Sequence, residues 1–324
     1  MNAPSSSTPV PPSSAHTTRP FKTEPFVAVP WERADLDSIV SRPFGIYLHV
    51  PFCTSRCGYC DFNTYALRTF PPGPAGDPIA HWAEQLTKEL RLGAQILTDH
   101  NITPPAANTV FFGGGTPSLL GRQLPKILDV VRECFGIAPG AEITSEANPE
   151  STSPELFDCW RAGGVNRLSL GMQSSEPRVL ALLDRQHDPA RAVAAIEEAQ
   201  AAGFEHLNLD LIYGTPGETT DDVARSVDTV LATGVDHVSA YALTIEPGTA
   251  LFRKVAHGEI DPIDDDMQAD RYYQIDAALQ GAGFHWYEVS NWARQRDARC
   301  RHNLGYWEGG NWWAAGPGAH GYMG

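Results

Sequence analysis

Three cysteines lie within one segment of eight residues, at Cys53, Cys57 and Cys60. Thiolates are soft ligands that suit zinc and iron–sulfur clusters. A structural zinc site needs four ligands, and no fourth Cys or His follows this segment at metal spacing. Three buried cysteines without a metal are the simplest alternative, although free cysteines are rarely this clustered. A cube held by three thiolates leaves one iron open to an outside ligand, so the spacing predicts an iron–sulfur cluster that takes part in chemistry.

Glycines and polar residues form further motifs along the chain. These motifs are Gly113-Gly114-Gly115-Thr116-Pro117, Ser145-Glu146-Ala147-Asn148-Pro149, Leu170-Gly171-Met172-Gln173-Ser174, Leu183-Asp184-Arg185-Gln186-His187 and the single Asp210. Glycines let a backbone approach a ligand closely, although plain turns favour glycine as well. Taken alone, Glu146 or Arg185 reads as a surface or salt-bridge residue, whereas an unpaired charge at Asp210 would be costly in its apolar setting. Whether these motifs do chemistry therefore depends on the elements that position them.

Short β-rich runs alternate with longer amphipathic stretches. The expected strands are 46–50, 109–112, 142–146, 167–170, 207–212 and 237–241, and a strand-like run follows at 284–289. The expected helices are 79–97, 123–134, 153–162, 189–202, 220–233 and 267–280. This alternation predicts an α/β fold of parallel strands with right-handed crossovers, as a partial barrel or a doubly wound sheet. In a barrel, active sites lie at the carboxyl ends of the strands, which is where we expect these polar motifs to fall.

The composition narrows the class of partner and the compartment. Lys and Arg number 24 against 39 Asp and Glu, a net charge of −15, which argues against a nucleic-acid partner. No stretch approaches the ~20 apolar residues of a membrane span, so membrane contact is expected to be peripheral at most. Six unevenly spaced cysteines suit a reducing compartment rather than a disulfide scaffold. The Ser/Pro-rich residues 1–24 lack a secretory signal and predict a disordered tail, so we expect a cytoplasmic protein.

The CxxxCxxC motif after a strand resembles the radical S-adenosylmethionine (SAM) superfamily. In that superfamily SAM chelates the open iron of a 4Fe–4S cluster, and an electron from the cluster splits SAM to a 5′-deoxyadenosyl radical. The resemblance implies that Cys53, Cys57 and Cys60 hold the cluster. It implies a partial (α/β)6 TIM-like barrel over residues 38–273, followed over 274–324 by the start of a truncated C-terminal region. Its implied cofactor contacts are Tyr47, Tyr59, Gly114, Gly115, Thr116, Glu146, Gln173, Arg185 and Asp210.

Five further sequence motifs make the resemblance more specific. They are YLHVPFC, FFGGGTPS, EANPE, LSLGMQS and LDLIYGTPGET. They are similar to the subgroup that contains oxygen-independent coproporphyrinogen III oxidase and the HemW-type heme chaperones. The oxidase carries an extra cysteine two positions after the third cluster ligand, where this chain has Phe62. The chaperone pattern His-Asn-x-x-Tyr-Trp is present from His302 to Trp307. Imidazole is a common heme ligand, so the resemblance implies that His302 contacts heme. Without the resemblance, a lone histidine is more often a packed or solvent-facing residue. His49 and His320 are weaker candidates for a heme ligand.

The chaperone resemblance implies a protein that binds heme and delivers it to apo-hemoproteins, respiratory ones among them. The 4Fe–4S cluster and SAM would support transfer or dimerisation, and an electron donor would serve the cluster. The alternative is the oxidase, which performs radical oxidative decarboxylation of coproporphyrinogen III propionates in heme biosynthesis. A related enzyme that opens or methylates heme is a third possibility. The sequence leaves open whether the chain is an enzyme.

Overall fold

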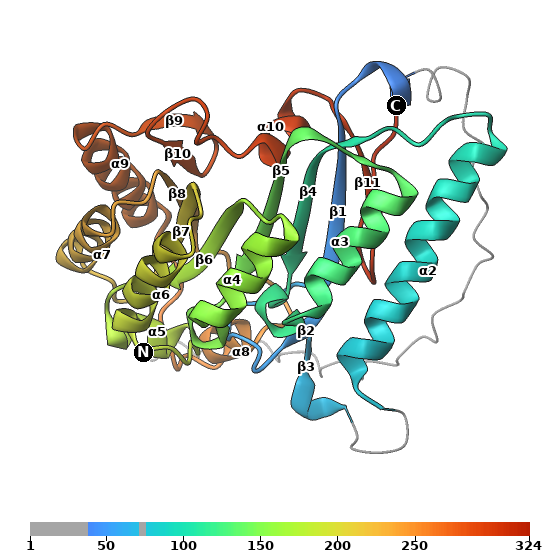
Figure 1. The fold of residues 1–324 in the computed structure, drawn as a ribbon. Helices are drawn as coiled ribbons and strands as arrows, with labels where there is room; N and C mark the ends of the chain where they lie inside the picture. The colour runs from blue at the N-terminus through green and yellow to red at the C-terminus, as the bar shows by residue number, and fades with distance from the viewer. Residues whose placement is uncertain (1–37, 71–75) are drawn as a thin grey trace, which may run out of the picture. The chain divides into compact units, whose positions relative to one another are not determined.

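A computed structural model of the chain describes residues 38–70 and 76–324 (Figure 1). The expected disordered tail at 1–24 lies outside these described residues. Within them, nine strands form one sheet. In sheet order the strands are β11 (Asn311–Ala315), β1 (Phe44–Val50), β4 (Ala107–Gly114), β5 (Ile137–Ala147), β6 (Arg167–Gln173), β7 (His206–Tyr213), β8 (His237–Ala242), β10 (Asn291–Ala293) and β9 (His285–Glu288).

The strand order distinguishes the two folds that periodicity left open. From β1 to β8 the parallel strands follow one another in chain order, without the reversal that defines a doubly wound sheet. The expected partial barrel is therefore confirmed, and each of the six predicted strands forms, extended by one to six residues. The two strands at one edge, β10 and β9, pair antiparallel.

Helices follow the strands as the alternation predicts. The longer ones are α2 (Pro78–Asp99), α3 (Gln123–Cys134), α4 (Pro154–Gly163), α6 (Pro189–Ala201), α7 (Thr220–Ala232) and α9 (Asp265–Gly281). The shorter ones are α5 (Pro177–Leu182), α8 (Ala250–Ala256) and α10 (Arg301–Trp307). Two residues fix the start of α4: the Ser153 hydroxyl accepts the Leu156 N–H, and Pro154 takes the first helical position.

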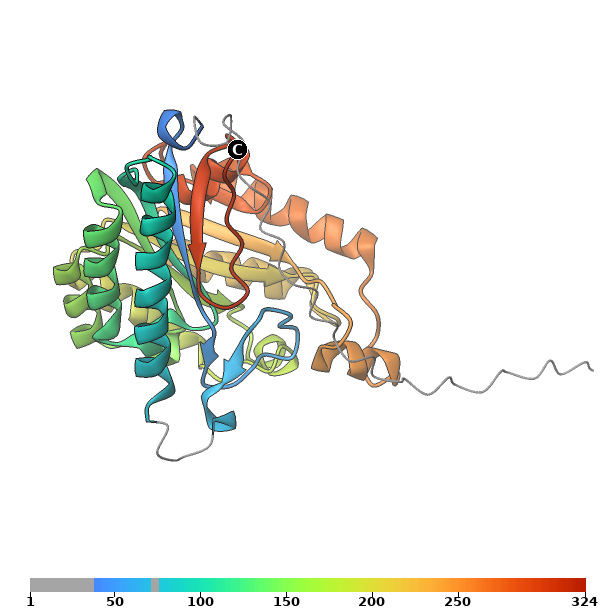
Figure 2. The same ribbon diagram turned by 90° about the vertical axis from the view of Figure 1, so that its right-hand side faces the viewer.

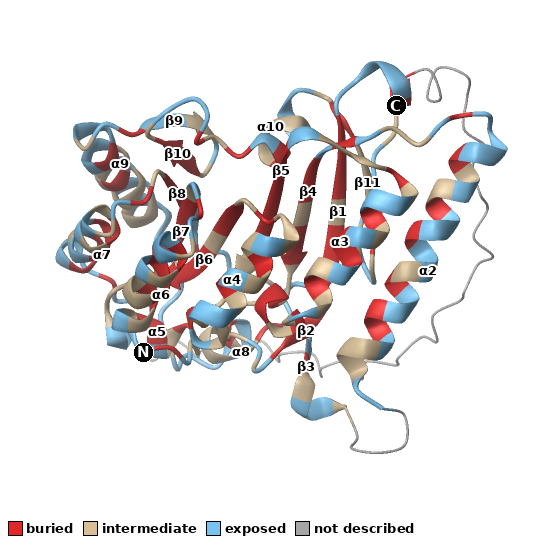
Figure 3. Ribbon diagram, in the orientation of Figure 1, coloured by how far each residue is buried: buried red, intermediate tan, exposed pale blue. Residues whose placement is uncertain are grey.

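The two faces of the sheet differ in chemistry. Helices α2, α3 and α4 pack side by side over one face, whereas the blue cysteine loop lies on the other (Figure 2). Leu48 and Phe112, on the helix side of the sheet, are fully buried. Much of β1 and β4 is drawn in the colour of buried residues (Figure 3). The alternate residues point the other way and are aromatic or polar, as in the paired Glu146 and Ser169. The inner face of the partial barrel therefore collects the polar side chains.

The C-terminal segment joins the same sheet. Residues 290–324, which show no clear periodicity, form β10, α10 and β11, and β11 pairs parallel with β1. The division of the chain at residue 273 stays a prediction, but strands from both sides of it share one sheet. Among the described helices, none is long and apolar enough to cross a bilayer.

Candidate functional site

The glycine turn after β4 holds the start of the cysteine loop. The Gly115 N–H donates to the Val50 carbonyl at 2.7 Å, and the Thr116 N–H donates to the Phe52 carbonyl at 2.7 Å. A Cβ atom on Gly115 would lie 2.5 Å from the Phe52 carbonyl oxygen, closer than real Cβ contacts allow. Glycine is therefore required here because two backbone segments touch.

Two later segments hold the far side of the same loop at Gly58. The Gly58 N–H donates to the Leu183 carbonyl at 3.1 Å, and its carbonyl accepts the Leu251 N–H at 2.8 Å. The neighbouring Tyr59 packs against an apolar cluster that includes Leu183 and Leu251. The loop is thus fixed from both sides, by β4 and by the segments around α5 and α8.

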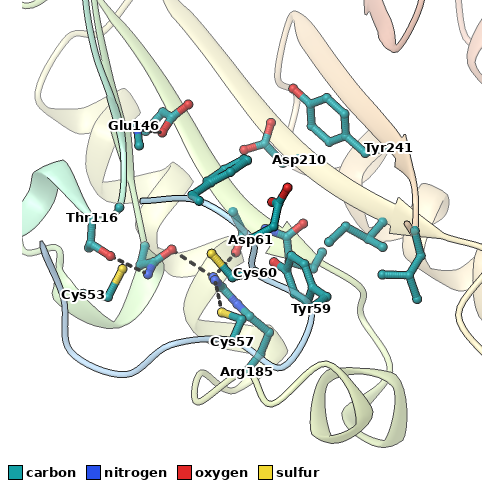
Figure 4. A pocket seen from close by; sticks show the side chains of 18 of the residues that line it. Cys53, Cys57, Tyr59, Cys60, Asp61, Thr116, Glu146, Arg185, Asp210 and Tyr241 are labelled. Atoms are coloured by element: carbon teal, nitrogen blue, oxygen red, sulfur yellow. Dashed lines mark hydrogen bonds between the residues drawn. The ribbon is translucent and has the colours of Figure 1, made fainter. Parts of the chain in front are cut away.

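The three predicted ligands line one cavity of about 480 Å³ (Figure 4). The other expected contact residues on its wall are Tyr59, Gly114, Gly115, Thr116, Glu146, Gln173, Arg185 and Asp210. All three thiols are free of disulfides. Burial raises the pKa of Cys53, against hydrogen bonds from Thr116 and Thr64 that lower it. The structure thus brings eleven of the thirteen expected site residues to one place.

The donor set fits an iron–sulfur cluster. The sulfur atoms of Cys53, Cys57 and Cys60 are soft donors at one end of the cavity, where the Arg185 guanidinium supplies positive charge beside them. In the described part of the chain, no three His, Cys, Asp or Glu side chains converge as the ligands of a single metal ion. The fit therefore rests on the thiols and their charged neighbour.

Arg185 connects the cysteine loop to the strand ends. Its Nη1 donates to Cys57 Sγ at 3.4 Å, and its Nη2 donates to Asn148 Oδ1 at 3.0 Å and to the Gly171 carbonyl at 2.8 Å. Asn148 in turn donates from Nδ2 to Thr116 Oγ1 at 3.1 Å. The expectations from sequence missed Asn148, although the EANPE motif contains it and its place after a strand was a usable signal.

Two carboxyl groups face the other end of the cavity. Burial and the nearby Asp210 raise the pKa of Glu146 to about 8, although the Gly114 N–H donates to its Oε2 at 3.1 Å. Burial also raises the pKa of Asp210, which accepts hydrogen bonds from Ser169 at 3.1 Å and Asn208 at 2.7 Å. A carboxyl that keeps its proton at neutral pH can donate as well as accept, which suits pairs of sugar hydroxyls.

Tyr241 and Gln173 complete this wall. Tyr241 lies across from Asp210 (Figure 4) and was missed by sequence reasoning, although it follows Ser239 at strand spacing on the same face of β8. Gln173 has a φ of 66° and a buried Oε1 that lacks a hydrogen-bond partner within the described residues. Both features cost free energy, so the surrounding structure must hold Gln173 in this conformation.

Two expected contact residues lie elsewhere. Tyr47 faces a second, adjoining cavity. His302 is only 4% exposed, with Nδ1 bonded to Thr109 Oγ1 at 2.8 Å and Nε2 to the Tyr306 hydroxyl at 2.9 Å. Burial lowers the pKa of His302 to about 3, so its ring is neutral. Because both nitrogens are engaged, the expected heme contact by His302 would require one of these bonds to break.

Comparison with known proteins is consistent with this geometry. Residues 47–230 match the radical SAM superfamily. The heme chaperone HemW of Mycobacterium tuberculosis is 57% identical over 92% of this chain and 74% of its own length. The heme chaperone HemW of Escherichia coli is 36% identical over 86% and 70%.

Among solved structures, coproporphyrinogen III oxidase (HemN) from Escherichia coli is similar to this chain. Its TM-score is 0.74 at 25% identity, and the match covers 91% of this chain and 68% of that enzyme. The identity to the chaperones is higher and extends over most of both chains. The chain therefore belongs to the radical SAM superfamily and, within it, to the HemW family.

Proposed function

We propose that the chain is a heme chaperone that binds heme and passes it to apo-hemoproteins. The observation that carries this proposal is the 57% identity to the mycobacterial heme chaperone HemW along 92% of the chain. Respiratory hemoproteins are among the expected recipients. The cytoplasm is the expected compartment, in keeping with six free cysteines and an acidic composition.

The first cavity is the cofactor site in this proposal. Cys53, Cys57 and Cys60 hold a 4Fe–4S cluster. The Arg185 guanidinium, which donates a hydrogen bond to Cys57 Sγ, offsets the negative charge of the cluster. When bound there, the cluster and SAM supply one-electron chemistry, for which the protein needs an electron donor. The chain's own part is to exclude water and to orient the cofactor.

The remaining walls suit the parts of SAM. Backbone groups of Gly114, Gly115 and Thr116 meet its methionyl end, and Gln173 lines the wall between the two ends. The carboxyl groups of Glu146 and Asp210 take the ribose hydroxyls, since a carboxyl that keeps its proton can donate as well as accept. The Tyr59 ring, fixed by its apolar cluster, packs on the adenine.

An oxidase acting on coproporphyrinogen III is the second candidate, because the solved structure with a TM-score of 0.74 is such an enzyme. The residue at position 62, a phenylalanine, argues against the oxidase activity. The side chain is 57% exposed and lines the cavity at the position where the oxidase resemblance calls for a further cysteine. A phenyl ring can neither bind a metal nor carry a proton, so a step that needs the thiol has no donor at this position.

Two assays on anaerobically reconstituted protein separate the candidates. The chaperone proposal predicts saturable binding of hemin by the wild type and no conversion of coproporphyrinogen III when SAM and a reductant are added. Formation of protoporphyrinogen under these conditions would establish the oxidase instead. A third result, loss of hemin together with SAM, would identify an enzyme that degrades or modifies heme.

A further inference from the structure

A second cavity of about 400 Å³ adjoins the cofactor site on the inner face of the partial barrel. The two cavities share Phe62, Gly114 and Glu146. The rest of the second lining consists of Tyr47, His49, Asn63, Tyr306, Trp312, Gly318, Ala319 and His320. Its volume lies within the roughly 300–1,000 Å³ of small-molecule sites. Whatever binds there would lie next to the cofactor.

Aromatic rings form the walls of this second cavity. Tyr47 comes from β1, Tyr306 from α10 and Trp312 from β11. The Tyr306 and Trp312 rings meet edge to face, with centroids 4.6 Å apart. His302 supports the wall from behind, because it holds the Tyr306 hydroxyl and stacks on Phe111 at 5.1 Å. Fixed rings of this kind suit a large flat aromatic ligand.

The three nearby imidazoles differ in what their nitrogens do. His49 is bonded at Nδ1 to the Tyr47 hydroxyl at 3.1 Å and at Nε2 to the Asn63 carbonyl at 2.9 Å. Both nitrogens of His302 are engaged as well. His320 is exposed on the cavity rim, and its ring forms no hydrogen bond with the described residues. His320 is thus the imidazole on this wall that is ready to bind a metal.

The backbone that carries His320 is held in place. Trp312 Nε1 donates to the His320 carbonyl at 2.8 Å, and Asn63 Nδ2 donates to the Pro317 carbonyl at 2.9 Å. At Gly316, where φ is 101°, a Cβ would lie 2.5 Å from the His49 carbonyl oxygen, so the turn packs directly on β1. Because this backbone is already fixed, binding at His320 orders only the torsions of its side chain.

We propose that the second cavity binds heme, with the His320 imidazole as axial ligand of the iron. This inference rests on the proposed chaperone function and assigns its cargo site. An imidazole nitrogen of His320 donates its lone pair to the iron, a water ligand of the iron leaves, and no electron is transferred. Tyr47, Tyr306 and Trp312 contact the porphyrin, while His302 positions Tyr306 without touching the iron. Because Glu146 lines both cavities, a heme in the second cavity lies beside the cofactor.

The test is a hemin titration of the full reconstituted chain, followed by the Soret band and by the ferric heme electron paramagnetic resonance spectrum. His320→Ala is expected to weaken hemin binding about tenfold or more and to remove the imidazole-ligated signature. Added imidazole should restore that signature. The matched control is His285→Ala, which removes another exposed histidine, on β9, and should behave as wild type.

A second probe separates the ligand from the walls. Metal-free protoporphyrin IX has no iron, so His320→Ala should bind it as wild type does, whereas Trp312→Ala should bind it less tightly. If wild type and His320→Ala bind hemin with the same affinity and spectrum, the assignment is wrong although the chaperone function stands. If the wild type binds no hemin, the chaperone function itself fails.

Discussion

The two adjoining cavities differ in how the chain builds them. The cofactor cavity takes its groups from consecutive strands, from β1 through β8, and collects thiols, carboxyl groups and a buried guanidinium. The second cavity takes its walls from β1 and from α10 and β11, which follow β1 in the chain by more than 250 residues, and it collects aromatic and imidazole rings.

This difference separates two tasks. The buried charges of the first cavity are satisfied by one another, as in the link from Arg185 to Cys57, so the site is sensitive to charge and pH. The second cavity depends on packed rings and on one free imidazole at His320. Ligand binding there should therefore depend on the shape of the ligand and on the metal that it carries. Substitutions should therefore affect one cavity and spare the other.

The largest expected effect is at Gly115. In Gly115→Ala the new methyl would meet the Phe52 carbonyl, so the cysteine loop must move away from β4. We expect nearly complete loss of iron and sulfide per chain, with binding of metal-free protoporphyrin IX retained. The matched control is Gly281→Ala, where a Cβ would meet nothing within 4 Å and the cluster should be unaffected. Full cluster content in Gly115→Ala would show that this contact does not fix the loop.

The next effect is at Arg185. Arg185→Gln removes the positive charge beside Cys57 Sγ, and a positive charge favours the reduced, more negative state of a cluster. We expect a lower midpoint potential and severalfold lower cluster content, measured by redox titration and iron analysis. Arg122→Gln removes an exposed arginine from the start of α3 and serves as the control. An unchanged potential in Arg185→Gln would mean that the guanidinium is merely structural.

A smaller effect concerns the pH dependence of stability. Because the pKa of Glu146 is raised from 4.5 to about 8, the folded chain holds a proton that the unfolded chain releases between these values. The contribution of Glu146 to the stability of the cofactor-free protein should be fully present below pH 4.5 and fall by roughly 2–4 kcal/mol as the pH rises to 8. Glu146→Gln should flatten this fall in urea unfolding, and equal slopes would contradict the protonated carboxyl.

The smallest effect tests the support of the second cavity. Thr109→Val removes the hydroxyl bonded to His302 Nδ1 and should destabilise the fold by about 1–3 kcal/mol. Porphyrin affinity should fall slightly through a looser Tyr306, and cluster content should stay at the wild-type level. A large loss of cluster in this variant would show that the two cavities are not independent.

The same contrast explains what the sequence could predict. The six parallel strands and their helices carry local signals, such as the Ser153-Pro154 helix start, and the fold follows from them. Several of the cofactor residues, such as Gly114, Glu146 and Gln173, come together because they stand at or just after the carboxyl ends of predicted strands. Asn148 and Tyr241 stand in equally good positions, but their roles appear only once the strands are in register.

The second cavity could not be predicted from local sequence patterns, because the strand pairing that forms it joins distant parts of the chain. The pairing of β11 with β1, which places Ala314 beside Tyr47, leaves no periodic signal in the Trp- and Gly-rich segment. His302 was singled out by its motif, whereas the structure gives it the burial and hydrogen bonds of a supporting residue. Only the packed fold shows that His320, a weaker candidate by sequence, has the free ring.

Heme transfer tests the central claim most directly. The heme-loaded chain is mixed with an apo-hemoprotein, and the appearance of the recipient's Soret spectrum is followed with and without the reconstituted cluster and SAM. The account predicts that heme moves to the recipient faster than it dissociates from the chain into a heme scavenger. Transfer no faster than this free release, or heme that stays on the chain, would contradict the chaperone function.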